Sequence, residues 1–584
     1  MLRLRSVLLA VAALAVGGVV AIGQADRTAG GDKVAPAVSR QAPLLHPKQL
    51  LSLVKVGFDD LGGNGFNGDI WVHGDYAYVG RWGISGICPS SGVRVIDITN
   101  PLDPVLVQSL PTPNGSRAND VKVAAISTAS FQGDLLVASN EACSGGPRGI
   151  QLWDVTDPLN PAELGRFDTR GVHNTYLYQR GDRAYVLLAV PFSEVLGPST
   201  GFPASDLQII DVTDPASPFL AGEWTIGRDA GLAFGAPGFT GAGLPAGSDC
   251  APPPGTPDFC RGTSASVYVH DVWASADGAV AYLSYWDAGL VTLDISDPTG
   301  PALIAVATEP LSDEGNAHNA VVDDVSDLIV VGDEDFTPNP WGFLRVLDEF
   351  DPANPVEAGT FATANALAPS PPDSGWYTAH NTTLADGLAY VAWYSDGVRV
   401  LDLTHPFGPE EVASFVPPDV PDPNGFLPAK ALVWGTAVQD DIVFASDMNA
   451  GIYVLGYDSD RDGCGDVQEE SAAAALGGER DSTSFWDFYD VPAGTPPERD
   501  RRVNIIDIGA IVLRFGAVSD PPLTKPQALA QALTTPPDTT SYHAAFDRGG
   551  PLPGEDLWDL QGPDGSINII DIGAAVIQFG HTCA

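Results

Sequence analysis

The feature that most constrains this chain is a strand-like motif that recurs seven times. The copies begin at Val93 (VRVIDITNP), Ile150 (IQLWDVTDP), Leu207 (LQIIDVTDP), Leu290 (LVTLDISDP), Leu344 (LRVLDEFDP), Val398 (VRVLDLTHP) and Ile452 (IYVLGYD). A shared aspartate recurs in the first six copies at intervals of 57, 57, 83, 54 and 54 residues, and Gly456 takes its place after a further 54. Apolar and polar residues alternate in each copy, which predicts β-strands, and the regular period indicates a repeat fold.

Each copy lies within a unit of four predicted strands. It runs into an outer strand such as PVEAGTF, and it follows strands of the types AYVAWY and HNTTLA. Four strands in about 50 residues is the size of a propeller blade. The seventh unit lacks its outer strand, and LLSLVKVGF from Leu50 resembles the missing one. The sequence therefore predicts an all-β, seven-bladed β-propeller over residues 46–457, closed by an N-terminal strand. A β-sandwich or an open array of repeats is the alternative.

A twelve-residue acidic loop, DSDRDGCGDVQE, follows the seventh copy over residues 458–469. Its carboxylates occupy positions 1, 3, 5, 9 and 12, and they belong to Asp458, Asp460, Asp462, Asp466 and Glu469. This is the spacing with which EF-hand loops surround Ca²⁺, and the glycine at position 6 allows the sharp turn. We predict a calcium site here, and a solvated acidic linker is the alternative.

Two later segments match each other: RRVNIIDIGAIVLRFG from Arg501 and GSINIIDIGAAVIQFG from Gly565. Each supplies an aspartate, an asparagine and an aspartate at loop positions 5, 9 and 12, and a short amphipathic helix follows. The two sets are Asp500, Asn504 and Asp507, and Asp564, Asn568 and Asp571. The upstream candidates are Asp490 in the first segment, and Asp559 and Gln561 in the second. We predict a calcium site in each segment.

Four of the nine histidines fall at one position of four consecutive units. His173, His270, His318 and His380 stand where the innermost strands of units three to six are predicted to begin. We expect them on one face of the propeller, around the mouth of its channel. Imidazoles in such a half-ring suit a transition metal such as Fe, Cu or Zn. The alternative is that each ring bonds the backbone of its neighbour and joins the blades.

The strand motifs resemble the LVIVD-repeat family of bacterial extracellular propellers over residues 50–457. This resemblance implies the propeller architecture but no single activity. The duplicated half-EF-hands look like dockerin modules, which join secreted proteins to cohesin-bearing scaffolds. That second resemblance implies a small, α-helical calcium-binding module over residues 458–584. It also implies that the residues choosing a partner are Ile505, Ile506, Ile569 and Ile570.

The N-terminus has the pattern of a secretory signal peptide. Arg3 and Arg5 precede an apolar run, and small residues follow at positions 23–25. We expect a signal peptide over residues 1–25, a linker over 26–45 and no later membrane span; a retained N-terminal anchor is the alternative. Six cysteines in an exported chain indicate disulfides. The predicted pairs are Cys88–Cys143, Cys250–Cys260 and Cys464–Cys583.

The formal net charge of −45 argues against nucleic acid as a partner, because phosphates repel an acidic surface. We expect a secreted protein, extracellular or at the cell surface, that binds without catalysis. Its partner would be an extracellular protein, with a cohesin-like module as one candidate, or a polysaccharide. The alternative is a metal-dependent extracellular enzyme that uses the four histidines.

Overall fold

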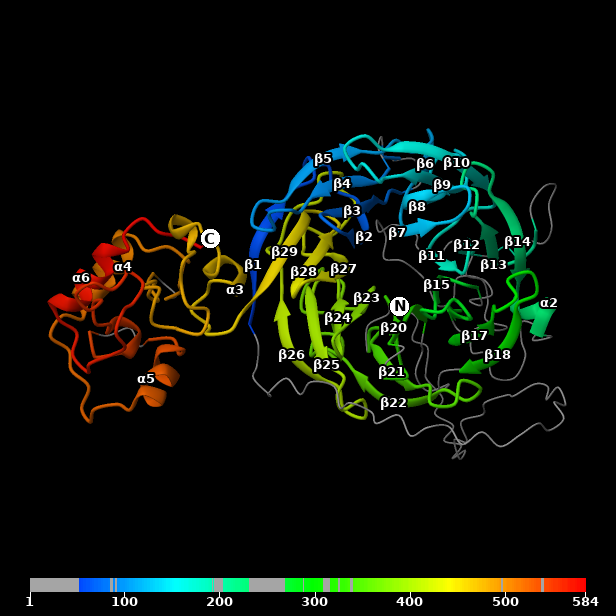
Figure 1. Cartoon of the computed structure of the whole chain (residues 1–584). Helices are drawn as coiled ribbons and strands as arrows, with labels where there is room; N and C mark the ends of the chain where they lie inside the picture. Colours follow the sequence, from blue (N-terminus) through cyan, green and yellow to red (C-terminus); the bar gives the residue numbers. More distant parts are fainter. Residues whose placement is uncertain are drawn as a thin grey trace, which may run out of the picture.

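The computed structural model describes residues 52–583 except 85–87, 90–91, 192, 194–202, 231–267, 287, 308–315, 324–325, 337–339, 495–496 and 537–539. Seven antiparallel sheets are arranged radially around one axis (Figure 1). The predicted seven-bladed β-propeller is therefore confirmed. The predicted signal peptide, the linker and the Cys250–Cys260 pair lie outside the described residues.

Each blade has four main strands, which we number from the axis outward. The innermost strands are β2 (Asn67–His73), β7 (Val121–Ser127), β11 (Thr175–Arg180), β15 (Asp271–Ala274), β19 (Ala317–Asp323), β23 (Thr382–Ala385) and β27 (Val433–Gln439). The second strands are β3 (Tyr76–Arg81), β8 (Gln132–Ala142), β12 (Arg183–Ala189), β16 (Val280–Ser284), β20 (Leu328–Asp333), β24 (Leu388–Ala392) and β28 (Ile442–Asp447). The third strands are β4 (Arg94–Asp97), β9 (Gly149–Asp154), β13 (Leu207–Asp211), β17 (Leu290–Asp294), β21 (Leu344–Asp348), β25 (Val398–Asp402) and β29 (Gly451–Asp458). The outer strands are β5 (Val105–Ser109), β10 (Ala162–Asp168), β14 (Phe219–Trp224), β18 (Ala302–Ala307), β22 (Val356–Phe361), β26 (Glu410–Phe415) and β1 (Ser52–Asp59). A short β6 (Ser116–Arg117) also pairs with β8, and a short helix, α2 (Ile226–Ala230), follows β14.

The ring closes through the N-terminal strand, as predicted. β1 pairs antiparallel with β29, so the seventh blade has the order β1-β29-β28-β27. Leu53 and Val56 on β1 are buried, while Phe58 is 39% exposed. Pairing with β1 covers the hydrogen-bonding edge that β29 would otherwise present to solvent.

Neighbouring blades pack face to face through apolar side chains, most of them aliphatic in the two clusters described next. One cluster joins blades two and three and includes Leu135 and Val186, while another joins blades seven and one and includes Phe444 and Ile70. The third strands therefore have both faces covered, and four successive residues of β17 are buried. This packing explains why the repeated motifs are rich in Val, Ile and Leu.

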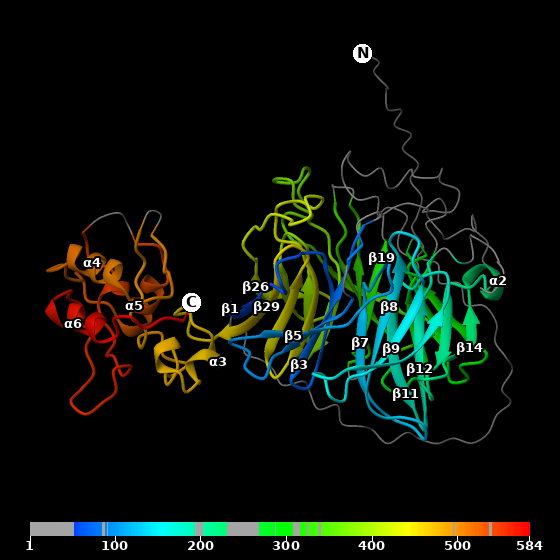
Figure 2. The same cartoon turned by 90° about the horizontal axis from the view of Figure 1, so that it is seen from above.

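Residues 459–583 form a region of short helices beside β1 and β29 (Figures 1 and 2). Its helices are α3 (Asp466–Glu469), α4 (Ile505–Leu513), α5 (Lys525–Ala532) and α6 (Ile569–Ile577), with 3-10 turns at η1 (Ala474–Leu476) and η2 (Ala544–Phe546). Its core contains Phe485, Tyr489, Ile511, Phe546 and Ile567. No helix in the described part of the chain is long and apolar enough to cross a membrane.

Two of the three predicted disulfides are confirmed. Cys88–Cys143 joins loops of blades one and two, with Cα atoms 5.5 Å apart. Cys464–Cys583 joins the acidic loop to the end of the chain, with Cα atoms 5.6 Å apart. The second bond encloses nearly the whole C-terminal region.

Candidate metal sites

The structure brings the four predicted histidines together in a row at the propeller axis. Each stands at or just before the start of an innermost strand. The ring centroids lie 4.3 Å apart for His173 and His270, 4.2 Å for His270 and His318, and 4.1 Å for His318 and His380. The last three residues are at most 8% exposed. Successive blades thus present equivalent side chains to one another.

Backbone carbonyls fix the orientation of two rings. Nδ1 of His270 lies 3.1 Å from the carbonyl oxygen of His318, and Nδ1 of His380 lies 2.5 Å from that of Trp434 in the next blade. A carbonyl only accepts, so Nδ1 carries the proton in both rings and Nε2 keeps its lone pair. Among the described residues, no hydrogen bond reaches Nε2 of His270, His318 or His380. The backbone bonds therefore occupy Nδ1 of His270 and His380 and leave Nε2 of both rings available to a ligand.

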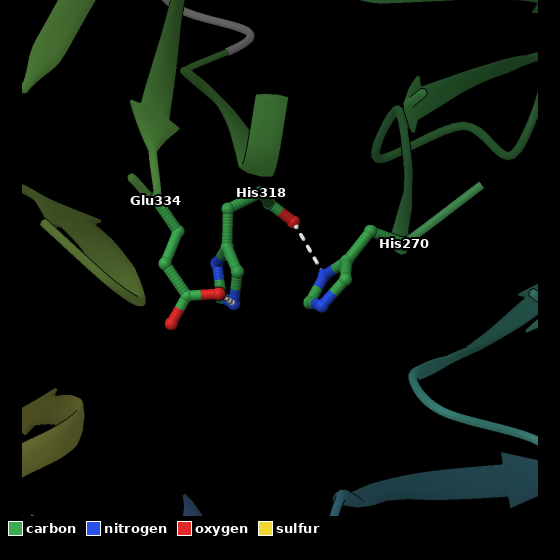
Figure 3. A group of neighbouring side chains, drawn as sticks. All are labelled: His270, His318 and Glu334. Atoms are coloured by element: carbon green, nitrogen blue, oxygen red, sulfur yellow. Dashed lines mark hydrogen bonds and ion pairs between the residues drawn. The ribbon is translucent and has the colours of Figure 1, made fainter. Parts of the chain in front are cut away.

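Glu334, directly after β20, is a buried carboxylate beside this row. Its oxygens lie 3.6 Å from Nε2 of His318 and 3.8 Å from Nε2 of His380. The hydroxyl of Tyr394 donates to it at 2.6 Å. One ligand atom from each of His270, His318 and Glu334 lies within 4.8 Å of the other two, and the three side chains reach into one region (Figure 3). Two nitrogen donors and one oxygen donor form a candidate transition-metal site.

Burial keeps most of the row uncharged. Desolvation, with the other imidazoles adding to it, holds the pKa of His270 and His318 well below the usual value. Desolvation also lowers the pKa of His380 to about 3 and raises the pKa of Glu334 to about 7. Neutral imidazoles keep the lone pair that a metal ion needs.

His173 has a different environment from the other three. Its Nδ1 lies 2.8 Å from a carboxylate oxygen of Glu141, and Nε of Arg117 donates to the same carboxylate at 2.6 Å. Burial alone would lower the pKa of His173, but the Glu141 carboxylate outweighs burial and raises it. Among the four rings, His173 is therefore the one whose environment favours protonation.

A second set of polar side chains links blades one residue beyond the histidines. Asn319 donates to Asp271 at 2.7 Å and accepts from the N–H of Thr382 at 3.1 Å. Asn381 donates to Asp69 of blade one at 2.8 Å. The two bonds of Asn319 are buried and hold blades four, five and six in register, whereas the part-buried Asn381–Asp69 bond spans from blade six to blade one.

Glu141 and Glu334 are not among the residues that the sequence analysis identified. They end the motifs SNE and GDE in blades two and five, where blades one, four and six have GRW, SYW and AWY. A glutamate in a position that is otherwise aromatic indicates a buried carboxylate with a specific partner. Aligning the ends of the second strands would have revealed both.

The predicted calcium loop turns several of its carboxylates inward. Asp460, Asp462 and Glu469 place ligand atoms within 4.8 Å of one another, and Asp487 from outside the loop joins them. Asp458 accepts the backbone N–H groups of loop positions 4 and 6 at 2.6 and 3.1 Å. These bonds give the loop its tight curvature.

Asp466 has a role outside this cluster. It accepts the backbone N–H of Ser459 at 2.8 Å and its hydroxyl at 2.6 Å. Position 9 thus closes the loop onto position 2.

The buried side chain of Arg480 supplies a positive charge to the acidic cluster. Its Nη1 lies 2.6 Å from Asp462 and 2.8 Å from Asp487, and its Nη2 lies 3.0 Å from Glu469. One guanidinium does not balance four carboxylates. Burial and repulsion from Asp462 raise the pKa of Asp460 to about 9 and the pKa of Glu469 to about 10. Oε2 of Glu469 and Oδ2 of Asp460 have no hydrogen-bond partner in the described part of the chain, so the donor set fits Ca²⁺.

The two duplicated segments build equivalent loops. In the first, the N–H of Arg501 donates to Asp490 at 2.5 Å; in the second, the N–H of Gly565 donates to Asp547 at 2.7 Å. Arg501 and Gly565 both have positive φ, 62° and 93°, so arginine here adopts a backbone conformation that favours glycine. In the first loop, three ligand atoms lie within 4.8 Å of one another, from Asp490, Asp500 and Asp507.

Asp547 stands at the start of the second loop, although the sequence analysis did not select it. Its carboxylate accepts the N–H of Asp564 at 3.1 Å. Gly549 and Gln561 exchange two backbone hydrogen bonds of 2.8 and 2.9 Å, which exclude the residues between them from the loop. Asp559 lies in this excluded segment and lines a cavity of about 360 Å³.

The asparagines and final aspartates of both segments cap α4 and α6. Asn504 accepts the N–H two residues later at 2.7 Å, and Asp507 accepts the N–H of Asn504 at 2.7 Å. Asn568 and Asp571 repeat these bonds at 2.8 and 2.6 Å. Each capping aspartate is also a predicted metal ligand, so the loop and the start of the helix are one unit.

Two pairs of isoleucines begin α4 and α6 and are largely exposed. Ile505 and Ile569 are each 68% exposed, while Ile506 and Ile570 are 56% and 52% exposed. The two helices pack side by side (Figures 1 and 2). We call these four residues the exposed isoleucine pairs.

Solved structures with similar folds have low sequence identity to this chain. Raptor from Chaetomium thermophilum is 10% identical over 69% of this chain, with a TM-score of 0.42, and the similarity spans 29% of the Raptor chain. The β-propeller domain of Cps50 (Swd1) from Myceliophteria thermophila is 10% identical over 67% of this chain and 96% of that one, with a TM-score of 0.41. The computationally designed protein Ika8 is 8% identical over 69% of this chain and 99% of that one, with a TM-score of 0.36. Scores at this level support no argument about function.

No curated protein matches the sequence. The LVIVD repeat family matches residues 64–112, 202–225 and 268–308. These stretches lie in blades one, three and four. The propeller of this chain therefore carries LVIVD repeats.

Proposed function

We propose that this chain is an exported interaction protein, whose C-terminal region joins the propeller to a partner protein in a calcium-dependent manner. The observation that carries the proposal is the occurrence of exposed isoleucine pairs at equivalent ends of α4 and α6. A β-propeller with LVIVD repeats suggests an interaction or scaffold domain.

The exposed isoleucine pairs favour a protein partner with an apolar face. Large aliphatic side chains that remain in water mark interaction sites, and covering each one stabilises a complex by about 1.5–3 kcal/mol. Because the segment is duplicated, each of the two adjacent helices carries one exposed isoleucine pair. The resemblance to dockerins makes a cohesin-like module the partner we propose.

Calcium would act on the same helices. Asp507 and Asp571 cap α4 and α6 and are also ligand candidates of the preceding loops. A cation that binds these carboxylates would fix the first turn of each helix, where the isoleucines stand. Partner binding should therefore depend on Ca²⁺.

Export is supported by the cross-links. The described residues contain two disulfides, a feature of oxidising compartments, and the N-terminal residues have the pattern of a signal peptide.

The test measures binding of the full-length protein to immobilised cohesin modules by interferometry, with Ca²⁺ and with chelator. The double variant Ile505→Asp with Ile569→Asp should bind at least about tenfold more weakly, because it places two charges in the contact. The matched control is Phe407→Asp, which changes an 80% exposed apolar residue of the propeller and should leave binding unchanged.

Two results would contradict this function. One is the absence of calcium-dependent binding to every cohesin tested. The other is a calcium-dependent dimer of the full-length protein in sedimentation that the double variant abolishes, because the isoleucines would then contact a second copy of the chain.

A further inference from the structure

We propose that His270, His318 and Glu334 bind a divalent first-row transition-metal ion on the propeller axis. The proposed interaction function does not use this site. Its donors converge from blades four and five, with one ligand atom of each within 4.8 Å of the other two.

The environment of His318 is the first observation that favours a ligand. This side chain is 1% exposed, and its Nε2 lies 3.6 Å from a carboxylate oxygen of Glu334. That distance is too long for a hydrogen bond, and it leaves room for an ion that both atoms would bind.

The charge of Glu334 is the second observation. Its side chain is 9% exposed, and within the described residues no lysine or arginine pairs with it. Its neighbours are Nε2 of His318, Nε2 of His380 and the hydroxyl of Tyr394, and none of them carries a fixed positive charge. A divalent cation between Glu334 and the two histidines would provide that charge.

The orientation of His270 suits this role. Its Nδ1–H is held by the carbonyl oxygen of His318, so the protonation state that exposes a lone pair on Nε2 is already selected. Metal-binding histidines commonly donate their other N–H to a carbonyl or carboxylate in this way. The hydroxyl of Tyr394 donates to Oε1 of Glu334 at 2.6 Å, while Oε2 faces His318.

An inter-blade backbone bond alone does not explain these histidines. The equivalent position holds Asn119 in blade two and Trp434 in blade seven, so the propeller closes without imidazole there. The buried bonds of Asn319 already link blades four, five and six. Joining the blades is therefore not a sufficient reason for histidine at these positions.

The donor set also separates this site from the acidic loops. Calcium prefers oxygen ligands only, whereas imidazole nitrogen with one carboxylate suits Fe(II), Co(II) or Zn(II). Excess Ca²⁺ should therefore fill the loops of the C-terminal region and leave the axial site open to a transition metal.

The experiment titrates the full-length protein with Co²⁺ in excess Ca²⁺ and follows the visible absorption of the ion. We expect the wild type to bind one equivalent in a site whose spectrum indicates nitrogen ligands, and Zn²⁺ to displace it. Glu334→Gln keeps an acceptor for Tyr394 but loses the charge, and it should abolish this spectrum, as should His318→Gln. Tyr394→Phe leaves the ligands in place and should weaken binding by about 10- to 100-fold.

Two controls distinguish the site from other histidines. His173→Gln changes the same row outside the proposed ligand set, and His405→Gln changes an exposed histidine; both should bind Co²⁺ as the wild type does. Circular dichroism establishes that each variant is folded. A folded wild type with no such spectrum, or a folded Glu334→Gln with wild-type affinity, would overturn the proposal.

Discussion

The propeller and the C-terminal region bury charged and polar groups in opposite ways. In the propeller, several buried polar side chains have partners in a neighbouring blade, as Asn319 has in Asp271 and Thr175 has in Asp120. In the C-terminal region, several carboxylates gather around Arg480, and oxygens of Asp460 and Glu469 have no hydrogen-bond partner among the described residues. From this difference we predict that the C-terminal region needs an added cation for its stability, whereas the propeller does not.

The two regions meet at the closing blade. β29 ends at Asp458, which is also the first residue of the predicted calcium loop. Arg501 donates from Nη1 to the carbonyl oxygen of Lys55 on β1 at 2.8 Å, and Val467 packs against the cluster that contains Val56. The closing strand is therefore the place where loss of one region would affect the other.

Deleting residues 52–58 should have the largest effect and should damage both regions. The deletion exposes the edge of β29 and removes Leu53 and Val56, whose burial contributes about 1.5–3 kcal/mol each. We expect calorimetry to show a propeller transition at a much lower temperature or none. Phe58→Ser on the exposed side of the same strand should change it little. An unchanged transition in the deletion variant would show that β1 does not close the ring.

Removing Arg480 should destabilise the C-terminal region and leave the stability of the propeller unchanged. Arg480→Gln leaves Asp462, Glu469 and Asp487 without their cation, which should destabilise the calcium-free C-terminal region by about 3–5 kcal/mol. Saturating Ca²⁺ should recover much of this loss, and the propeller transition should not move. Calorimetry with calcium and with chelator provides the measurement. A loss that calcium does not reduce would contradict a cation site at this loop.

Opening the second disulfide should act on the C-terminal region alone. Replacing Cys464 and Cys583 with serine releases a loop of 119 residues and should lower the stability of this region by about 2–4 kcal/mol. Limited proteolysis should then cut residues 459–583 faster while the propeller survives. The matched pair, Cys88→Ser with Cys143→Ser, should leave those cuts unchanged. Equal cutting of both variants would show that the regions are not independent.

The sequence was sufficient for the propeller because its information is periodic. Seven copies of one strand motif determine the number of blades, and the missing outer strand of the seventh identifies β1. The acidic loop was also predictable in part, because its ligands are local in sequence. Asp487 and Arg480 were not, because they enter the cluster from outside the twelve-residue pattern.

The second duplicated loop also contains a residue that the local sequence pattern did not predict. Spacing alone favours Asp559 as an upstream ligand, but backbone pairing of Gly549 with Gln561 removes that segment and brings in Asp547. The repeat predicted the row of histidines, but Glu334 stands out only when the ends of the second strands are aligned as well. Its contact with the histidines depends on how strands and blades pack, which local spacing does not show.

Breaking one link between blades should have the smallest effect and should confine it to the propeller. Asn319→Ala removes a donor to Asp271 and an acceptor for the N–H of Thr382, and both partners are buried. Each lost hydrogen bond should lower stability by about 0.5–1.5 kcal/mol, so the propeller should unfold at a lower temperature. Asn160→Ala is the matched control. Asn160 donates to Asp157 in an exposed turn, and water can replace this bond, so the unfolding temperature should fall far less. If the two variants unfolded alike, the buried polar links would not stabilise the ring, and burial of aliphatic side chains alone would account for the stability of the propeller.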